Sequence, residues 1–171
     1  MDMFLNWVNA NVLRKYDTIL VGGFAEPYFL AANNGHLAEI RFTHDYYSSA
    51  LHELAHWCIA GCERLRQNDF GYWYVPTGRS SEEQEQFYQA EVKPQAVEKA
   101  FTMLLGIEFN FSHDNIGTKV GDGERFARKV EAQYRNYLQS GFPPRAQLIM
   151  DGLKSENSYD KHLAHMLACN S

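Results

Sequence analysis

The residues best suited to chemistry in this 171-residue chain are His52, Glu53 and His56, within the sequence LHELAHW. On a helix, residues four positions apart differ by roughly 40° around the axis, so both imidazoles project from one face and can bind a single metal ion. Glu53 lies roughly 100° from His52, where it can contact metal-bound water without displacing a ligand. Two surface histidines are the alternative, but the stretch is largely apolar, and an unpaired imidazole pair buried in it would be costly. The pattern therefore predicts a metal site.

A metal site that keeps an open coordination position usually needs a third protein ligand. The downstream candidates are Glu91, Glu98 and His113. Glu98 shares the inward apolar stripe of its predicted helix, where a carboxylate needs a cation. Glu91 lies at a predicted helix end, which favours a capping or supporting role, and His113 in a polar loop is more simply a solvated turn residue. We therefore predict Glu98 as the third ligand beside the two histidines.

Two histidines and one glutamate serve two chemistries. With zinc they activate water for peptide hydrolysis, with Glu53 as general base. With ferrous iron the same ligands leave open positions for dioxygen and form an oxygenase site. A third alternative is a non-enzymatic protein in which the metal only joins two helices. The 2-oxoglutarate-dependent oxygenase pattern is disfavoured, because none of the seven histidines has an acidic residue two positions later.

The element that must position the two histidines is a long helix predicted from about Tyr46 to Arg66, a proline-free stretch rich in helix formers. Downstream, Ser80 or Ser81 is expected to cap one helix, and Pro94 to lie in the first turn of another that runs to about Leu105. Further helices are predicted near residues 4–13, 124–139, 144–153 and 160–167.

Strands are predicted at Thr18–Val21, which Gly22-Gly23 closes, at Leu37–Phe42 and at Ile107–Phe111. The pattern contains no repeat or linker, and the length fits one domain over residues 1–171. The predicted fold class is α+β: a mainly helical single domain with a small β-sheet and a metalloprotease-like HExxH helix.

Composition and charge exclude other classes of protein. Sixteen basic residues against 21 acidic ones give a net charge of -5 without a basic block, which disfavours nucleic-acid binding and favours a basic partner. The sequence has no signal-peptide pattern and no apolar stretch long enough to span a bilayer, so we expect a cytoplasmic protein with no membrane partner. Cys58 and Cys62 point roughly 200° and 240° away from His56 on the helix and are expected to be reduced thiols, not ligands.

The same residues carry a resemblance that extends well beyond the HExxH motif. LHELAHWCIAG, followed by DFGYWY at residues 69–74 and by EVKPQAVE at residues 91–98, resembles the bacterial elongation factor P hydroxylase family. The match in order and spacing runs from Leu51 through the second acidic motif and into the flanking helices. It is therefore much more specific than the HExxH pattern alone.

The resemblance implies a protein hydroxylase, a monooxygenase that uses dioxygen to modify a lysine of translation elongation factor P already extended by a β-lysyl group. By the same resemblance, His52, His56 and Glu98 would hold a non-haem iron, Fe(II), and Glu53 would be the acid or base beside it. Zinc or another divalent metal is the alternative cofactor, and an HExxH zinc metallopeptidase with a glutamate third ligand is the alternative function. The choice between Glu91 and Glu98 is where the transfer from the family is least secure.

An aromatic run at Tyr72, Trp73 and Tyr74 adds a candidate substrate groove. Aromatic faces bind ammonium groups, so these side chains could meet the cationic chain of a lysyl-lysine. A half-buried strand is the simpler interpretation of such a cluster. Glu91 is a candidate for a supporting position beside the metal.

Overall fold

The computed structural model describes residues 2–69, 81–112 and 122–155. Within them the elements follow in the order α1 (Asp2–Asn11), η1 (Leu13–Tyr16), β1 (Thr18–Phe24), β2 (Tyr28–Leu30), β3 (Ala38–Thr43), α2 (Tyr47–Ile59), η2 (Arg64–Arg66), α3 (Ser81–Leu105) and α4 (Asp122–Ser140). One more helix covers residues 144–155. The predicted α+β class, mainly helical with a small sheet, is confirmed.

The sheet has three strands in the order β1-β3-β2, with β1 parallel and β2 antiparallel to the central β3. Buried residues alternate along β3, as the period of two in a strand requires. β1 continues beyond its predicted end at Val21, through an irregularity in register, to Phe24. Gly22 is needed there, because an added Cβ would lie 2.5 Å from the ring of Phe42. The sequence did not predict β2, because three residues are too few to show an alternating pattern. In the structure all three are half-buried.

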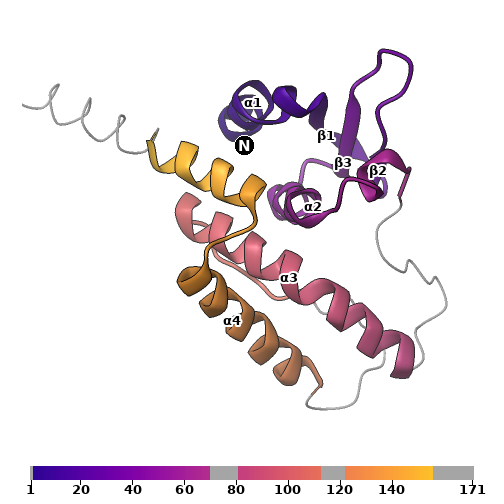
Figure 1. Ribbon diagram of the computed structural model, residues 1–171. Helices are drawn as coiled ribbons and strands as arrows, with labels where there is room; N and C mark the ends of the chain where they lie inside the picture. The colour runs from indigo at the N-terminus through magenta and orange to yellow at the C-terminus, as the bar shows by residue number, and fades with distance from the viewer. Residues whose placement is uncertain (1, 70–80, 113–121, 156–171) are drawn as a thin grey trace, which may run out of the picture.

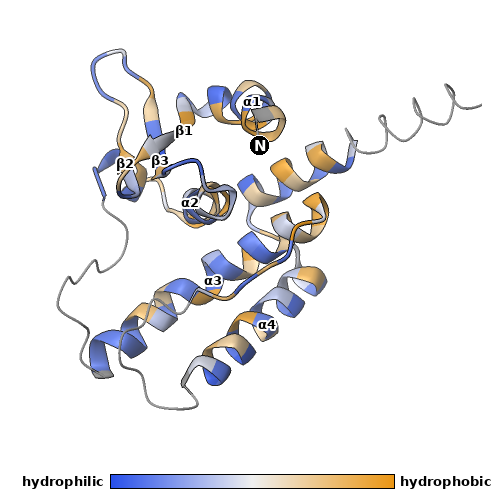
Figure 2. Cartoon of the chain, turned by 180° about the vertical axis from the view of Figure 1, so that it is seen from behind, coloured by the Kyte–Doolittle hydropathy of each residue, from blue (hydrophilic) through white to orange (hydrophobic). Residues whose placement is uncertain are grey.

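The histidine-bearing helix α2 lies between the sheet and α3, and α4 packs along α3 (Figure 1). One core cluster joins α1, the sheet, α2, α3 and the 144–155 helix. A second, smaller cluster lies between α3 and α4 around Phe87, Tyr88 and Phe126. Figure 2 shows hydrophilic and hydrophobic segments together on α4, as expected for a helix with one face on a core. In the part of the chain that the structure describes, no helix has the length and apolar character needed to cross a membrane.

Beyond the sheet strands described above, the structure differs from the predicted elements in three further places. α2 ends at Ile59, not near Arg66, because Ala60 takes an extended backbone with φ of -60° and ψ of 134°. Residues 107–111 form neither helix nor strand, so the strand predicted there is wrong. The helix predicted at residues 160–167 lies outside the described residues.

The third difference concerns α3, which is one helix of 25 residues with Pro94 inside it. An internal proline removes a backbone hydrogen bond and costs about 3 kcal/mol or more, which is why the sequence predicted a boundary. In the fold, Pro94 is among the most fully buried side chains. Burial along both sides of the helix therefore outweighs the local cost, and α3 continues as one helix through the proline.

Candidate metal centre

The two histidines of the HELAH motif converge at the middle of α2. Leu51, Leu54 and Ala55 on the same helix are fully buried and fix its orientation against the core. This leaves the imidazoles of His52 and His56 on the side towards α3, with 23% and 19% of their side chains exposed. Their Nε2 atoms are 3.1 Å apart, and their ring centroids are 4.7 Å apart. The expectation that both rings share one helix face is therefore confirmed.

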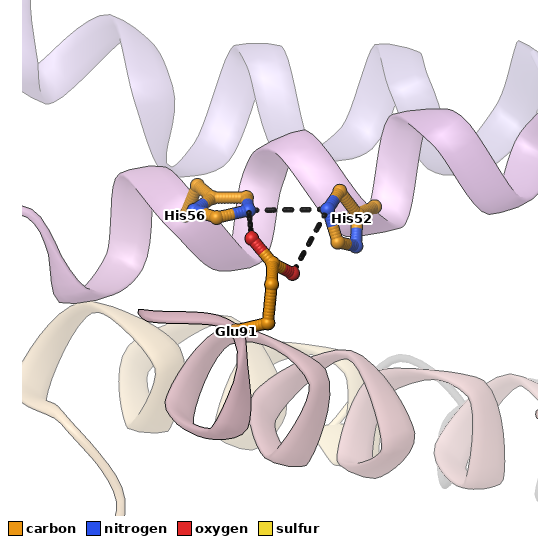
Figure 3. Close-up of side chains that lie close together, drawn as sticks. All are labelled: His52, His56 and Glu91. Atoms are coloured by element: carbon orange, nitrogen blue, oxygen red, sulfur yellow. Dashed lines mark hydrogen bonds and ion pairs between the residues drawn. The ribbon is translucent and has the colours of Figure 1, made fainter. Parts of the chain in front are cut away.

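Glu91 of α3 faces both imidazoles at once (Figure 3). Its Oε1 lies 3.2 Å from Nε2 of His56, and its Oε2 lies 3.5 Å from Nε2 of His52. Only 4% of this side chain is exposed, so its charge needs a partner inside the protein. One ligand atom from each of the three residues lies within 4.8 Å of the others, close enough to surround a single ion.

The separation of the two Nε2 atoms fits a shared ion. Two nitrogens bound at about 2.1 Å would lie about 3.0 Å apart at an octahedral angle and about 3.4 Å apart at a tetrahedral one. The observed 3.1 Å falls between these values. Two imidazole nitrogens and one carboxylate are also donors that zinc and ferrous iron both accept. The residues present therefore fit a divalent transition metal.

Glu98 contacts the other nitrogen of His52. Its Oε2 lies 2.9 Å from Nδ1, and 8% of its side chain is exposed. Nδ1–H can donate to this carboxylate, which leaves the lone pair on Nε2 free on the side of Glu91. Glu91, and not the predicted Glu98, therefore lies beside the Nε2 atoms of both histidines.

The physical reason for this difference is the spacing of the two carboxylates on α3. Glu91 and Glu98 are seven residues apart, so they differ by only about 20° around the helix axis. Helical angle can show that both face α2, but not which of them lies level with the two Nε2 atoms. The height at which α2 crosses α3 decides that, and it is a property of the packed fold.

Gln95 supports Glu91 and was missed by the sequence analysis. Its Nε2 donates to Oε2 of Glu91 at 3.4 Å and to the carbonyl of Ser112 at 2.9 Å, while its Oε1 accepts from the Ser112 N–H at 3.2 Å. The side chain is fully buried. A glutamine four residues after Glu91, in the middle of an apolar stripe, was the available signal. The contacts hold the irregular segment after α3 against the helix.

The charges around the imidazoles shift the pKa values strongly. Burial lowers the pKa of His52, but the hydrogen bond to Glu98 and the charges of Glu91 and Glu98 outweigh it and raise the pKa to about 10. For Glu91, burial is outweighed by His56 and His52, and the pKa falls to about 2. Burial raises the pKa of Glu53. The carboxylates of Glu91 and Glu98 place negative charge beside the imidazoles, which a divalent cation would neutralise.

Other candidates lie apart from this centre. Cys58 is buried and Cys62 is exposed, and neither belongs to the metal-binding group found among the described residues. Burial raises the pKa of the Cys58 thiol, which keeps it protonated. The aromatic run at Tyr72, Trp73 and Tyr74 lies outside the described residues, and so does His113.

Comparison with known proteins adds independent information. A family model described as Elongation factor P hydroxylase matches residues 7–167. A protein of Haemophilus influenzae named Elongation factor P lysine hydroxylase is 44% identical over 140 residues, which cover 81% of this chain and 79% of the relative. Both matches include all of the residues placed at the centre, and they confirm the resemblance identified from the sequence.

Proposed function

Because this chain belongs to the elongation factor P hydroxylase family, we propose that it hydroxylates a lysine side chain of elongation factor P at an iron centre held by His52, His56 and Glu91. The family match, which covers nearly the whole chain, carries the assignment of a hydroxylating oxidoreductase. The convergence of two imidazoles and a buried carboxylate supports a metal as its cofactor. The alternative of a zinc peptidase is supported only by the HExxH pattern.

The choice of iron follows from the reaction. Hydroxylation of an unactivated C–H bond needs redox chemistry, which zinc does not supply. When bound by two histidines and one carboxylate, ferrous iron supplies open positions at which dioxygen is activated. One oxygen atom enters the lysine side chain, and the other leaves as water with two protons and two electrons from an external reductant.

Each residue around the ligands has a task in this proposal. Glu98 accepts a hydrogen bond from the Nδ1–H group of His52, and this leaves Nε2 as the coordinating atom. Gln95 restrains one oxygen of Glu91. Glu53 has a pKa that burial raises, so it can hold a proton beside the reacting atoms and release it during turnover.

We propose that the substrate is elongation factor P whose lysine already carries a β-lysyl group, and that the reaction takes place in the cytoplasm, where translation factors act. The name of the Haemophilus influenzae relative supports elongation factor P as the target. The net charge of -5 favours a substrate that presents a cationic side chain. Dioxygen is the proposed co-substrate.

The decisive experiment loads the purified protein anaerobically with Fe(II) and adds β-lysylated elongation factor P, a chemical reductant and ¹⁸O₂. We expect mass spectrometry to show one ¹⁸O atom on the modified lysine. The protein loaded with Zn(II) and the Glu91→Gln variant are the matched controls, and both should leave the substrate unchanged. Failure of the iron-loaded protein to add oxygen, together with cleavage of casein by the zinc-loaded protein, would overturn the proposal in favour of the peptidase.

A further inference from the structure

A pocket of about 350 Å³ lies where the end of α2, the middle of α3, the end of α4 and the start of the 144–155 helix meet. None of the three residues of the metal-binding group lines it. The described residues that do line it include two cations, Lys93 and Arg145, and one phenol, Tyr137, but no acidic side chain. The charge of this pocket is therefore opposite in sign to the net charge of the protein.

Lys93 is an exception among the cations of α3 and α4. The other five all form ion pairs with glutamates: Lys99, Arg125, Arg128, Lys129 and Arg135. Lys93 is exposed and has no ion pair within the part of the chain that the structure describes. Because acidic residues outnumber basic ones in this protein, a shortage of carboxylates does not explain the difference. The ammonium group of Lys93 is left to an anion from outside the chain.

Arg145 also lacks an acidic partner among the described residues. One of its terminal N–H groups donates to the carbonyl of Ala60 at the end of α2, and its guanidinium lies 4.8 Å from the ring centroid of Trp57. These contacts with uncharged groups hold the guanidinium in place but do not cancel its charge. Its Nε–H is buried and has no hydrogen-bond partner in the described chain. The guanidinium therefore keeps its full charge and unused hydrogen-bonding capacity.

Two further features of the pocket favour an anion. The hydroxyl of Tyr137 forms no hydrogen bond with the described residues, and burial raises the pKa of this phenol, so it stays protonated and can donate. The 144–155 helix begins at the pocket, and the N-terminal end of a helix carries a partial positive charge. An ammonium, a guanidinium and a phenol thus offer three donors to one ligand.

We propose that this pocket binds a phosphate group, either as the free ion or as part of a small organic phosphate. A phosphate monoester carries a charge of about -1.5 to -2 and three acceptor oxygens, which match two cations and three donors. A carboxylate has a single charge and two oxygens, so it would leave one cation without a counter-charge. Pockets for small molecules measure about 300–1,000 Å³, so the volume also leaves room beside the phosphate.

Calorimetric titration of the purified protein with inorganic phosphate, which replaces chloride at constant ionic strength, tests this inference. We expect saturable binding of about one phosphate per chain. Lys93→Gln should weaken the binding about tenfold or more, the effect of one lost hydrogen bond between charged groups. Tyr137→Phe, which keeps the ring, should weaken it about fivefold, because the lost donor is neutral.

Lys15→Gln is the matched control. It also removes the charge of an exposed lysine that has no ion pair in the described chain, but Lys15 does not line the pocket. Its affinity for phosphate should equal that of the wild type. An affinity of Lys93→Gln equal to that of the wild type would overturn the inference, and so would the absence of saturable binding. Acetate that binds as tightly as phosphate would overturn it in favour of a carboxylate.

A phosphate bound to the metal ion is separated by a titration of both metal-loaded and metal-free protein. We expect equal phosphate affinities, because no residue of the metal-binding group lines the pocket. Binding that disappears with the metal would refute the pocket assignment. Glycerol 3-phosphate then distinguishes the two sources of phosphate. Tighter binding than that of inorganic phosphate would indicate an organic phosphate, and equal or weaker binding would indicate the free ion.

Discussion

Two carboxylates of α3, Glu91 and Glu98, approach the same imidazole of His52 from its two nitrogen atoms. Glu91 lies 3.5 Å from Nε2 and also reaches His56, whereas Glu98 lies 2.9 Å from Nδ1 and contacts only His52 among the two histidines. Both are nearly fully buried, and both lie on the same face of α3. The comparison teaches that residue type, burial and helix face do not decide which acid can bind a metal. The nitrogen atom that each carboxylate faces decides it.

Replacement of Glu91 by glutamine should have the largest effect. An amide in place of the carboxylate removes one of the three candidate ligand atoms and the charge that neutralises the ion. We expect metal affinity to fall by more than about 100-fold, beyond the range for partners that act through a ligand. Competition titration with a metal chelator measures this. An affinity within about threefold of the wild type would show that Glu91 is not a ligand.

Glu98→Gln should have a clearly smaller effect on the same measurement. This side chain acts through His52, and loss of such a partner typically costs about 10- to 100-fold in metal affinity. At saturating Fe(II), the variant should still hold one ion per chain by elemental analysis. The comparison between the two acids would be reversed if Glu98→Gln lost the metal and Glu91→Gln retained it.

The pH dependence of metal binding should further separate the role of Glu98, which acts through His52, from that of Glu91. The pKa of His52 is about 10 in the metal-free fold against an ordinary value of 6.5, because the hydrogen bond to Glu98 and nearby negative charges outweigh burial. A metal that binds the imidazole must displace this proton, so the affinity should rise up to about tenfold per pH unit in the neutral range and level off near the raised pKa. Chelator titrations at a series of pH values test this, and Glu98→Gln should level off at a lower pH.

The raised pKa of His52 also determines how the stability of the metal-free protein depends on pH. A raised pKa means that protonated His52 stabilises the metal-free fold fully below about pH 6.5, and that this contribution is lost as the pH rises through about 10. In thermal unfolding of chelator-treated protein, the stabilisation by protonated His52 should therefore decrease as the pH rises. The metal-loaded protein should not show it, because the proton is already absent.

Gln95→Met tests the support of Glu91 with a volume close to the original. We expect a loss of about 1–3 kcal/mol in the free energy of unfolding, because the backbone groups of Ser112 lose their partner. Metal affinity should fall only several-fold, since Glu91 keeps both histidine contacts. Chemical denaturation and chelator titration on the same sample separate the two effects. A loss of affinity as large as that of Glu91→Gln would contradict this assignment.

The smallest effect is expected for Cys58→Ala, on the part of α2 that packs into the core. The thiol is 3% exposed, so its removal should destabilise the fold modestly. Metal affinity should stay within about twofold of the wild type, because the thiol belongs to no ligand group in the described chain. A large drop in affinity without unfolding would bring this cysteine into the site.

Part of this arrangement was predictable from the sequence. The four-residue spacing of His52 and His56 predicts their shared face from local geometry alone, and the strand at Ala38–Thr43 follows from local pattern as well. Glu91 was not predictable as the residue level with the histidines, because that depends on where two distant helices cross. The continuity of α3 through Pro94 was also missed, since tertiary burial there overrides a local preference.

That continuity has a consequence for how the chain can change in length. Glu91 and Glu98 are spaced by seven residues, about 10.5 Å of helix rise, on one uninterrupted rod. Insertion of a single residue between them would turn one carboxylate by about 100° away from His52, and no side-chain rotation would restore both contacts. The number of residues in the stretch EVKPQAVE must therefore stay at eight for both carboxylates to reach His52.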